Sequence, residues 1–191
     1  EKNKNNQVMQ LIEKAGAFVS INYGGYLVIG GEQESLNNLL KTLPPVKQYP
    51  YQLPYHGAFH TPLLKNISKK AKKLLSQKII QKPTIPLIDG NGKIWLPWSA
   101  DKKDLWEYTF EEQVLRTYNF SESIKVAIKE FCPDHLVLLG PGNTLGGAVG
   151  QILIEHNWND IDSKDAFFKK QNEFSYLISM SLDSQRKLIA T

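Results

Sequence analysis

A short apolar run that leads into a glycine-rich turn constrains the fold of this chain more than any other feature. Leu136 to Leu139 are continuously apolar, as expected of a strand that is buried on both faces of a sheet. Gly140-Pro141-Gly142 follows, and a helical pattern then extends from Thr144 to about Glu155. A buried strand that turns directly into a helix is typical of α/β proteins. The sequence therefore predicts an α/β fold.

The first 53 residues carry a different pattern. Apolar spacing predicts helices over Val8 to Lys14 and Glu34 to Leu43. Two β-rich runs, Ala17 to Ile21 and Tyr26 to Ile29, flank turn residues and predict a hairpin. Val46 to Leu53 predicts another strand. The order helix, strand, strand, helix, strand matches a ferredoxin-like unit that lacks its first strand, so we assign residues 1–53 to a partial ferredoxin-like small subdomain.

The part after residue 53 alternates helical and hairpin patterns. An apolar helical stripe begins after Pro62, and Asp89-Gly90-Asn91-Gly92 between apolar residues predicts a β-hairpin. Further helices are predicted over Leu105 to Leu115 and over Ser121 to Phe131, with Ser121 as the N-cap of the second. The tail from Trp158 has scattered apolar residues, and we expect it to pack over the core.

Composition narrows the classes of function. The net charge of +4 arises from 23 Lys and Arg against 19 Asp and Glu. Basic residues concentrate between Lys65 and Lys82, but neither zinc-ligand spacing nor a basic-region helix appears, so nucleic-acid binding is disfavoured and no metal site is expected. No apolar run approaches the length of a membrane helix. The single cysteine, Cys132, fits a reducing cytoplasm, and we expect it and nearby His135 to be structural.

The segment from Tyr55 to Pro62, YHGAFHTP, holds the strongest candidate for catalysis. His60 is predicted at the end of a strand, just before Pro62 begins a helix, where α/β folds expose catalytic groups. An unperturbed imidazole titrates close to neutral pH, so it can take a proton from a hydroxyl and return it to a leaving group. The alternative is a turn histidine that only hydrogen-bonds its neighbours, and spacing alone favours that alternative.

Four boxes, in the same order, resemble the malonyl-CoA:acyl-carrier-protein transacylases of fatty-acid and polyketide synthesis. Residues 57–64, GAFHTPLL, are similar to the family's GAFHSPLM box. Residues 22–31, which contain NY and VIGG, resemble its NYNSPGQVVISG hairpin, and residues 138–145, LLGPGNTL, resemble its EVGPGKVL turn. Gln113-Val114-Leu115 with Asn119-Phe120 and Ile124 matches its QL…VRW…V segment at equal spacing. The four boxes together, covering roughly Ala15 to Gln151, make the resemblance specific.

This resemblance implies that residues 54–191 are the C-terminal part of an α/β-hydrolase-like acyltransferase large subdomain. It implies transfer of a malonyl group from coenzyme A to acyl-carrier protein by a Ser-His dyad, with His60 as the base and no cofactor beyond the coenzyme A thioester. The main-chain carbonyl of Gln113 would hold the second ring nitrogen of His60, although the sequence by itself favours a solvated helix residue there. The substrate-binding positions it implies are Phe59, Ala58 and Asn22, with core packing an equal alternative for Phe59.

The nucleophile is the main departure from the family pattern. No serine here has the two flanking glycines of a GxSxG elbow. We therefore expect this chain to supply His60 but not the serine, which would belong, with the arginine that binds the malonyl carboxylate, to a missing N-terminal half. Gly24 replaces the second asparagine of the hairpin motif, and Thr61 replaces a serine. The alternative is a non-catalytic carrier-protein-binding or scaffold domain; a lipid acyl hydrolase is a weaker one.

Overall fold

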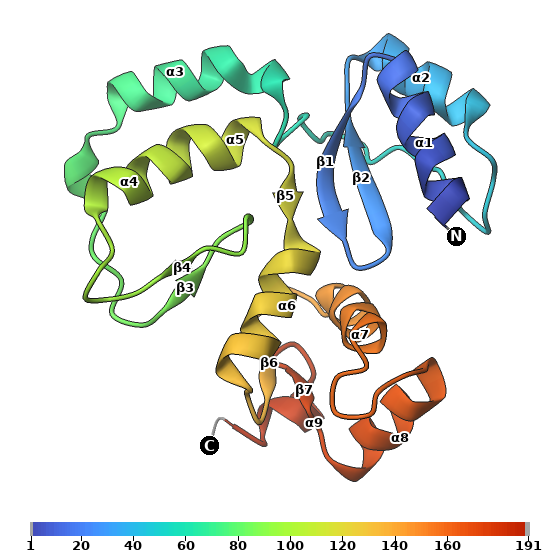
Figure 1. Cartoon of the computed structure of the whole chain (residues 1–191), viewed down its shortest axis with the longest axis vertical. Coiled ribbons are helices and arrows are strands. Elements are labelled where there is room, and N and C mark those ends of the chain that lie inside the picture. Colours follow the sequence, from blue (N-terminus) through green and yellow to red (C-terminus); the bar gives the residue numbers. More distant parts are fainter. Residues whose placement is uncertain (1, 190–191) are drawn as a thin grey trace. The chain divides into compact units, whose positions relative to one another are not determined.

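The computed structural model describes residues 2–189, and it confirms the predicted α/β class (Figure 1). The chain forms two compact units, and each unit is built from three separate stretches of the sequence. The first comprises residues 2–22, 27–87 and 95–118, and the second comprises residues 23–26, 88–94 and 119–189. These units are not divided at residue 53, so the predicted subdomain boundary stays a prediction about the acyltransferase family's architecture.

The beginning of the chain folds as its sequence predicts. Helix α1 (Lys2–Lys14) leads into the hairpin of β1 (Phe18–Tyr23) and β2 (Tyr26–Gly30), and helix α2 (Gln33–Thr42) follows. A small apolar cluster joins α1 to α2, because both helices turn one apolar stripe toward the same side. Its buried members are Ile12, Ala17 and Leu39.

The predicted strand over Val46 to Leu53 is wrong. The segment instead closes a tight turn, in which the Val46 N–H donates to the Tyr49 carbonyl at 2.9 Å and the Tyr49 N–H donates back at 3.0 Å. Prolines explain the error, since a proline supplies no N–H for a strand ladder; they occupy positions 44, 45, 50 and 54. The strand β5 (Tyr118–Asn119) pairs with β1 instead, giving the sheet order β2-β1-β5.

The segment that follows His60 forms a 3₁₀ turn, a helix and a short hairpin. The 3₁₀ turn Pro62–Leu64 continues into α3 (Lys65–Leu74), and the predicted hairpin is present as β3 (Leu87–Ile88) and β4 (Ile94–Trp95). The predicted helix over Leu105 to Leu115 is also present, but it has three parts. They are α4 (Lys102–Glu107), a π-helical segment (Tyr108–Glu112) and α5 (Gln113–Leu115).

The second unit is built around α6 (Phe120–Phe131) and α7 (Leu145–Glu155). The side chain of Asn119, not that of Ser121, caps α6 by accepting the Glu122 N–H at 3.1 Å, so the predicted N-cap is wrong by two residues. The tail does pack over this core, as predicted. It contributes α8 (Lys164–Glu173), β7 (Leu177–Ser179) and α9 (Asp183–Arg186).

Strand β6 (Leu136–Leu138) confirms the strand predicted there and pairs in parallel with β7. Burial on both faces is wrong, because Val137 is 40% exposed and Leu139 is 82% exposed. The main hydrophobic cluster packs against this pair of strands. Its buried members are Ile128, Val149, Leu153, Ile161, Tyr176 and Leu177. Within residues 2–189, no helix combines the length and apolarity that crossing a membrane requires.

Candidate active site

His60 lies in the loop between the Val46–Tyr49 turn and the Pro62–Leu64 turn, and not at the end of a strand as predicted. Its backbone is left-handed, with a φ of 59°. This conformation is uncommon for residues with a side chain, and it persists only where surrounding contacts hold it. Such strain is frequent at functional sites, so the backbone conformation of His60 is consistent with a functional role.

Two side-chain hydroxyls hold the main chain just before His60. Ser20 on β1 donates its Oγ–H to the Phe59 carbonyl at 2.7 Å. Thr61, which is fully buried, donates its Oγ1–H to the Ala58 carbonyl, also at 2.7 Å. The methyl group of Thr61 also fills space beside Gly30, where an added Cβ would lie only 2.9 Å from Thr61 Cγ2. The loop is therefore fixed to both strands of the hairpin.

The imidazole of His60 is oriented by Gln113. The distance from His60 Nδ1 to the main-chain carbonyl oxygen of Gln113 is 2.5 Å. A carbonyl oxygen can only accept, so this contact is a hydrogen bond when Nδ1 carries the proton. In the neutral ring, Nε2 then holds the free lone pair that a general base needs. The contact is the one that the family resemblance implies, while the catalytic role of the pair stays a prediction.

The helix end explains why the Gln113 carbonyl can accept a bond from a side chain. The last carbonyls of any helix lack partners within it. Here α5 stops at Leu115, and the Arg116 N–H donates to the Glu112 carbonyl as the final helical bond. The next carbonyl is that of Gln113, and His60 supplies its donor. Gln113 therefore acts through its backbone, and its side chain is not needed for the contact.

Tyr118 is a neighbour of His60 that the sequence did not indicate. Its ring lies 5.4 Å from the imidazole, centroid to centroid, at an angle of 45°. It belongs to β5, the strand that takes a place beside β1. Because that two-residue strand carries no recognisable pattern, no sequence signal could have placed Tyr118 here. The ring packs beside the imidazole.

The predicted substrate-binding residues lie in this region to different extents. Phe59 directly precedes His60 and is 56% exposed, so core packing does not account for it. Ala58 is half-buried and contacts the hairpin at Gly30. Asn22 is half-buried near the end of β1, two residues after the serine that holds the Phe59 carbonyl. Their contacts with a substrate stay predictions.

The departure at Gly24 has a structural reason. Its φ is 53°, and its N–H donates to Ser121 Oγ at 3.0 Å. An added Cβ would lie 2.4 Å from the carbonyl oxygen of Ala148 on α7. The hairpin tip therefore approaches that helix too closely for an asparagine side chain, and Gly24 serves packing in this protein.

The weaker candidates, Cys132 and His135, lie in the second unit, and their structural role stays a prediction. Cys132 is exposed in the left-handed position that ends α6, with a φ of 43°. The ring of His135 stacks on Phe174 at 4.7 Å, and its Nδ1 lies 3.1 Å from the Ser175 carbonyl. Among residues 2–189, no group of three or more His, Cys, Asp and Glu side chains is arranged to hold a metal ion.

Comparison with known proteins defines the class to which this fold belongs. No family model matches the sequence. The acyl-carrier-protein S-malonyltransferase of Burkholderia pseudomallei superposes with a TM-score of 0.64 at 19% identity, covering 77% of this chain and 48% of the other. The protein titled MCAT from Streptococcus pneumoniae gives 0.59 at 20% identity, covering 97% and 53%. The fold is therefore that of part of a malonyltransferase.

Two sequence relatives also carry acyltransferase names. The polyketide biosynthesis acyltransferase homolog BaeD of Bacillus velezensis is 30% identical over 145 residues, which are 75% of this chain and 42% of that protein. The homolog PksD of Bacillus subtilis is 27% identical over 135 residues, covering 71% and 40%. The chain thus spans about two fifths of the length of these relatives. The resemblance to the acyltransferases of fatty-acid and polyketide synthesis is confirmed.

Proposed function

We propose that the protein to which this chain belongs transfers a malonyl group from malonyl-CoA to acyl-carrier protein, and that His60 is its general base. The hydrogen bond between His60 Nδ1 and the Gln113 carbonyl is the observation that carries the proposal. It orients the ring without adding a second charged group, as a neutral substitute for the aspartate of a Ser-His-Asp triad. The relatives' names and the shared fold support acyl transfer as the reaction class.

The proposed chemistry is two successive acyl transfers. A serine hydroxyl attacks the thioester carbon, and its proton moves to the free Nε2 of His60. The C–S bond then breaks, and the same proton leaves Nε2 for the thiolate of coenzyme A. In the second half, the carrier-protein thiol gives its proton to Nε2 as it attacks the serine ester. The C–O bond to serine then breaks, and Nε2 returns the proton to the serine oxygen. The Gln113 carbonyl accepts from Nδ1–H throughout and stabilises the imidazolium when it forms.

We propose that the serine, together with the arginine that would bind the malonyl carboxylate, comes from a part of the protein outside these 191 residues. No serine here lies in a GxSxG elbow, and the curated relatives are more than twice as long as the matched region. The β6–β7 pair also supports this division. Parallel sheets are normally covered on both faces, yet Val137 and Leu139 are exposed. Elements from the rest of the protein that pack on this exposed face would cover them.

The thioester substrates fit the reducing cytoplasm that the single cysteine suggests. The lysines of α3 remain candidates for contact with an acidic carrier protein, with one exception. The Lys72 ammonium is paired with the Glu107 and Glu111 carboxylates, so it is not free for a partner. The other lysines of this helix are exposed: Lys65, Lys69, Lys70 and Lys73.

The test compares two histidines of one loop in the complete protein. His60→Ala is expected to lower kcat/KM for malonyl transfer by roughly 100- to 10,000-fold, the usual cost of removing a positioned general base. His56→Ala is the matched control, because His56 is exposed and its Nδ1 contacts only the nearby Pro54 carbonyl at 2.8 Å. We expect the control to stay within about threefold of the wild type, as remote surface changes do.

Two results would contradict the proposal. Equal activity of His60→Ala and wild type would remove His60 from the chemistry. A wild-type protein that binds carrier protein but forms no malonyl-enzyme by intact mass would instead support the non-catalytic scaffold.

A further inference from the structure

Two segments of the first unit run antiparallel and are joined by a series of polar contacts. One segment extends from His60 through α3, and the other extends from α4 through the π-helical segment to α5 (Figure 1). The His60–Gln113 bond is the first contact of the series. Apart from the Lys72–Glu111 ion pair, each later contact pairs a residue farther along the first segment with one farther back along the second. The orienting bond of the candidate site is therefore one of several cross-links between the same two segments.

The second contact is the most buried. Ser68, which is 2% exposed, donates its Oγ–H to the main-chain carbonyl of Phe110 at 2.6 Å. Phe110 lies inside the π-helical segment, where the Gln113 N–H reaches back five residues to the Tyr108 carbonyl. A π-helical insertion changes the normal bonding ladder, and side-chain donors from a neighbouring element can bond its carbonyls. Ser68 supplies such a donor to Phe110, and Phe110 lies three residues before Gln113, whose carbonyl holds His60.

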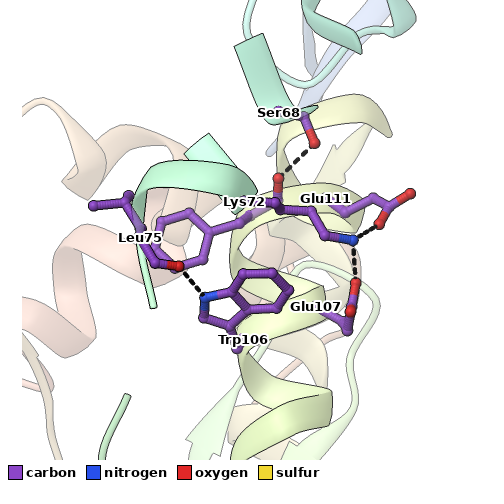
Figure 2. Close-up of polar contacts among 7 residues, drawn as sticks. Ser68, Lys72, Leu75, Trp106, Glu107 and Glu111 are labelled. Atoms are coloured by element: carbon purple, nitrogen blue, oxygen red, sulfur yellow. Dashed lines mark hydrogen bonds and ion pairs between the residues drawn. The ribbon is translucent and has the colours of Figure 1, made fainter. Parts of the chain in front are cut away.

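Figure 2 shows the remaining contacts, which involve residues of the first segment that follow Ser68. The Lys72 ammonium lies between the carboxylates of Glu107 and Glu111 and 5.2 Å from the centroid of the Trp106 ring. The indole N–H of Trp106 donates to the Leu75 carbonyl at 3.0 Å, at the C-terminal end of α3. Trp106 is buried, whereas Lys72 and its partners are partly exposed. These contacts fix the two segments at the end remote from the site.

We propose that Ser68 is a positioning residue for the catalytic histidine. Its hydroxyl fixes the π-helical segment against α3, and this sets the Gln113 carbonyl at the distance and angle at which it accepts from His60 Nδ1–H. The hydroxyl itself contacts neither the imidazole nor the substrate. This inference rests on the proposed function for its consequence in catalysis, but the orientation of His60 that it explains can be measured without any reaction.

The decisive experiment reads the protonation of the His60 ring in the complete protein. Nitrogen-15 NMR distinguishes the neutral tautomer with a proton on Nδ1 from the one with a proton on Nε2. In the wild type we expect the Nδ1–H tautomer to dominate, because the Gln113 carbonyl can only accept. In Ser68→Ala we expect a mixture of both tautomers. In the complete enzyme, the same change should lower kcat roughly 10- to 100-fold with KM nearly unchanged, as misplacement by about an ångström does.

Ser123→Ala is the matched control. Ser123 is also buried on a helix, and its Oγ–H donates to the Asp89 carbonyl at 2.7 Å, but it belongs to the second unit. We expect its loss to leave the His60 tautomer as in the wild type. If Ser68→Ala does not fold, Ser68→Cys keeps the volume close and replaces a strong donor by a weak one.

The outcomes separate this inference from the proposed function. A folded Ser68 variant that retains the wild-type Nδ1–H tautomer would overturn the positioning role while leaving His60 as the base. A mixture of tautomers equally present in Ser123→Ala would also overturn it, because the effect would then follow from any buried-hydroxyl loss. Loss of activity on His60→Ala is decided by the separate kinetic test.

Discussion

The hydrophobic cluster of the second unit and the segment around His60 in the first unit are held by different kinds of contact. In the second unit, six buried apolar side chains from α6, α7 and the tail form one continuous cluster. In the first unit, the segment around His60 is held by hydroxyl and imidazole donors that bond main-chain carbonyls. These bonds are Ser20 to Phe59, Thr61 to Ala58, His60 to Gln113 and Ser68 to Phe110.

The two kinds of contact have different consequences: apolar burial mainly stabilises the fold, whereas hydrogen bonds position individual groups. Apolar burial is strong but non-directional, and a buried leucine contributes about 1.5–3 kcal/mol wherever it packs. A hydrogen bond contributes only about 0.5–1.5 kcal/mol net, but it fixes distance and angle. A site whose base must hold one nitrogen toward a nucleophile needs the second kind of contact. The first unit accordingly carries the directional contacts at His60.

The largest expected effect on stability lies in the apolar cluster. Leu153→Ala removes a fully buried side chain and should lower the free energy of unfolding by about 2–5 kcal/mol. Leu74→Ala makes the same chemical change on α3, where the side chain is 82% exposed, and should change stability by no more than about 0.5 kcal/mol. Urea unfolding followed by circular dichroism measures both.

The comparison adds a second readout to the same variants. Leu153→Ala should leave the His60 tautomer as in the wild type while the protein remains folded, whereas Ser68→Ala should change it. If Leu153→Ala shifted the tautomer as strongly as Ser68→Ala, stability and positioning would not be separable in this protein.

A smaller effect is expected at the hairpin tip. Gly24→Ala places a Cβ 2.4 Å from the Ala148 carbonyl oxygen and forces a left-handed φ on alanine, so it should cost about 1–3 kcal/mol. Gly147→Ala is the control on α7, because nothing lies within 4 Å of its added Cβ. That change should be neutral or stabilise by up to about 1 kcal/mol, since glycine is a weak helix former. Equal thermal melting temperatures for the two variants would show that the tip is not closely packed.

Much of the fold could be predicted from local patterns. The hairpin of β1 and β2, the helix α2 and the strand β6 follow from turn residues, apolar spacing and a short apolar run. His60 could be singled out only by resemblance, because a single histidine in a loop has no spacing that marks it. Gln113 was found in the same way, and its role is carried by a backbone carbonyl that no side-chain pattern reveals.

The errors arose where long-range contacts decide. The segment after Val46 has strand-forming side chains, but its prolines leave it without a ladder, and β5 pairs with β1 from 95 residues farther along the chain. Ser121 has the right chemistry for an N-cap, yet the side chain of Asn119 caps the helix two residues earlier. The hydroxyl of Ser121 instead accepts a hydrogen bond from the Gly24 N–H. The π-helical segment has no sequence signature, so Ser68 could not have been connected to the site.

The smallest expected effect concerns the ion pairs at the remote end of the cross-linked segments. The hydrogen bond from Lys72 lowers the pKa of Glu111, and hydrogen bonds to Glu107 and Glu111 raise the pKa of Lys72. The Glu111 contribution is therefore present above the ordinary glutamate pKa and is lost as the pH falls through the lowered one. The Lys72 contribution is complete below the ordinary lysine pKa and is lost as the pH rises through the raised one.

Because both carboxylates are about half exposed, the pair should contribute only about 0.2–1 kcal/mol near neutral pH. Glu111→Gln should lose that amount at pH 7, and the difference from wild type should shrink at acidic pH as the pH falls through the lowered pKa of Glu111. Glu130→Gln, an exposed change on α6, is the control and should show no such pH-dependent difference. Urea unfolding at pH 7 and at acidic pH measures the effect. A loss at pH 7 several times larger than 1 kcal/mol would mean that charged contacts, and not the buried Ser68 bond alone, hold the two segments together.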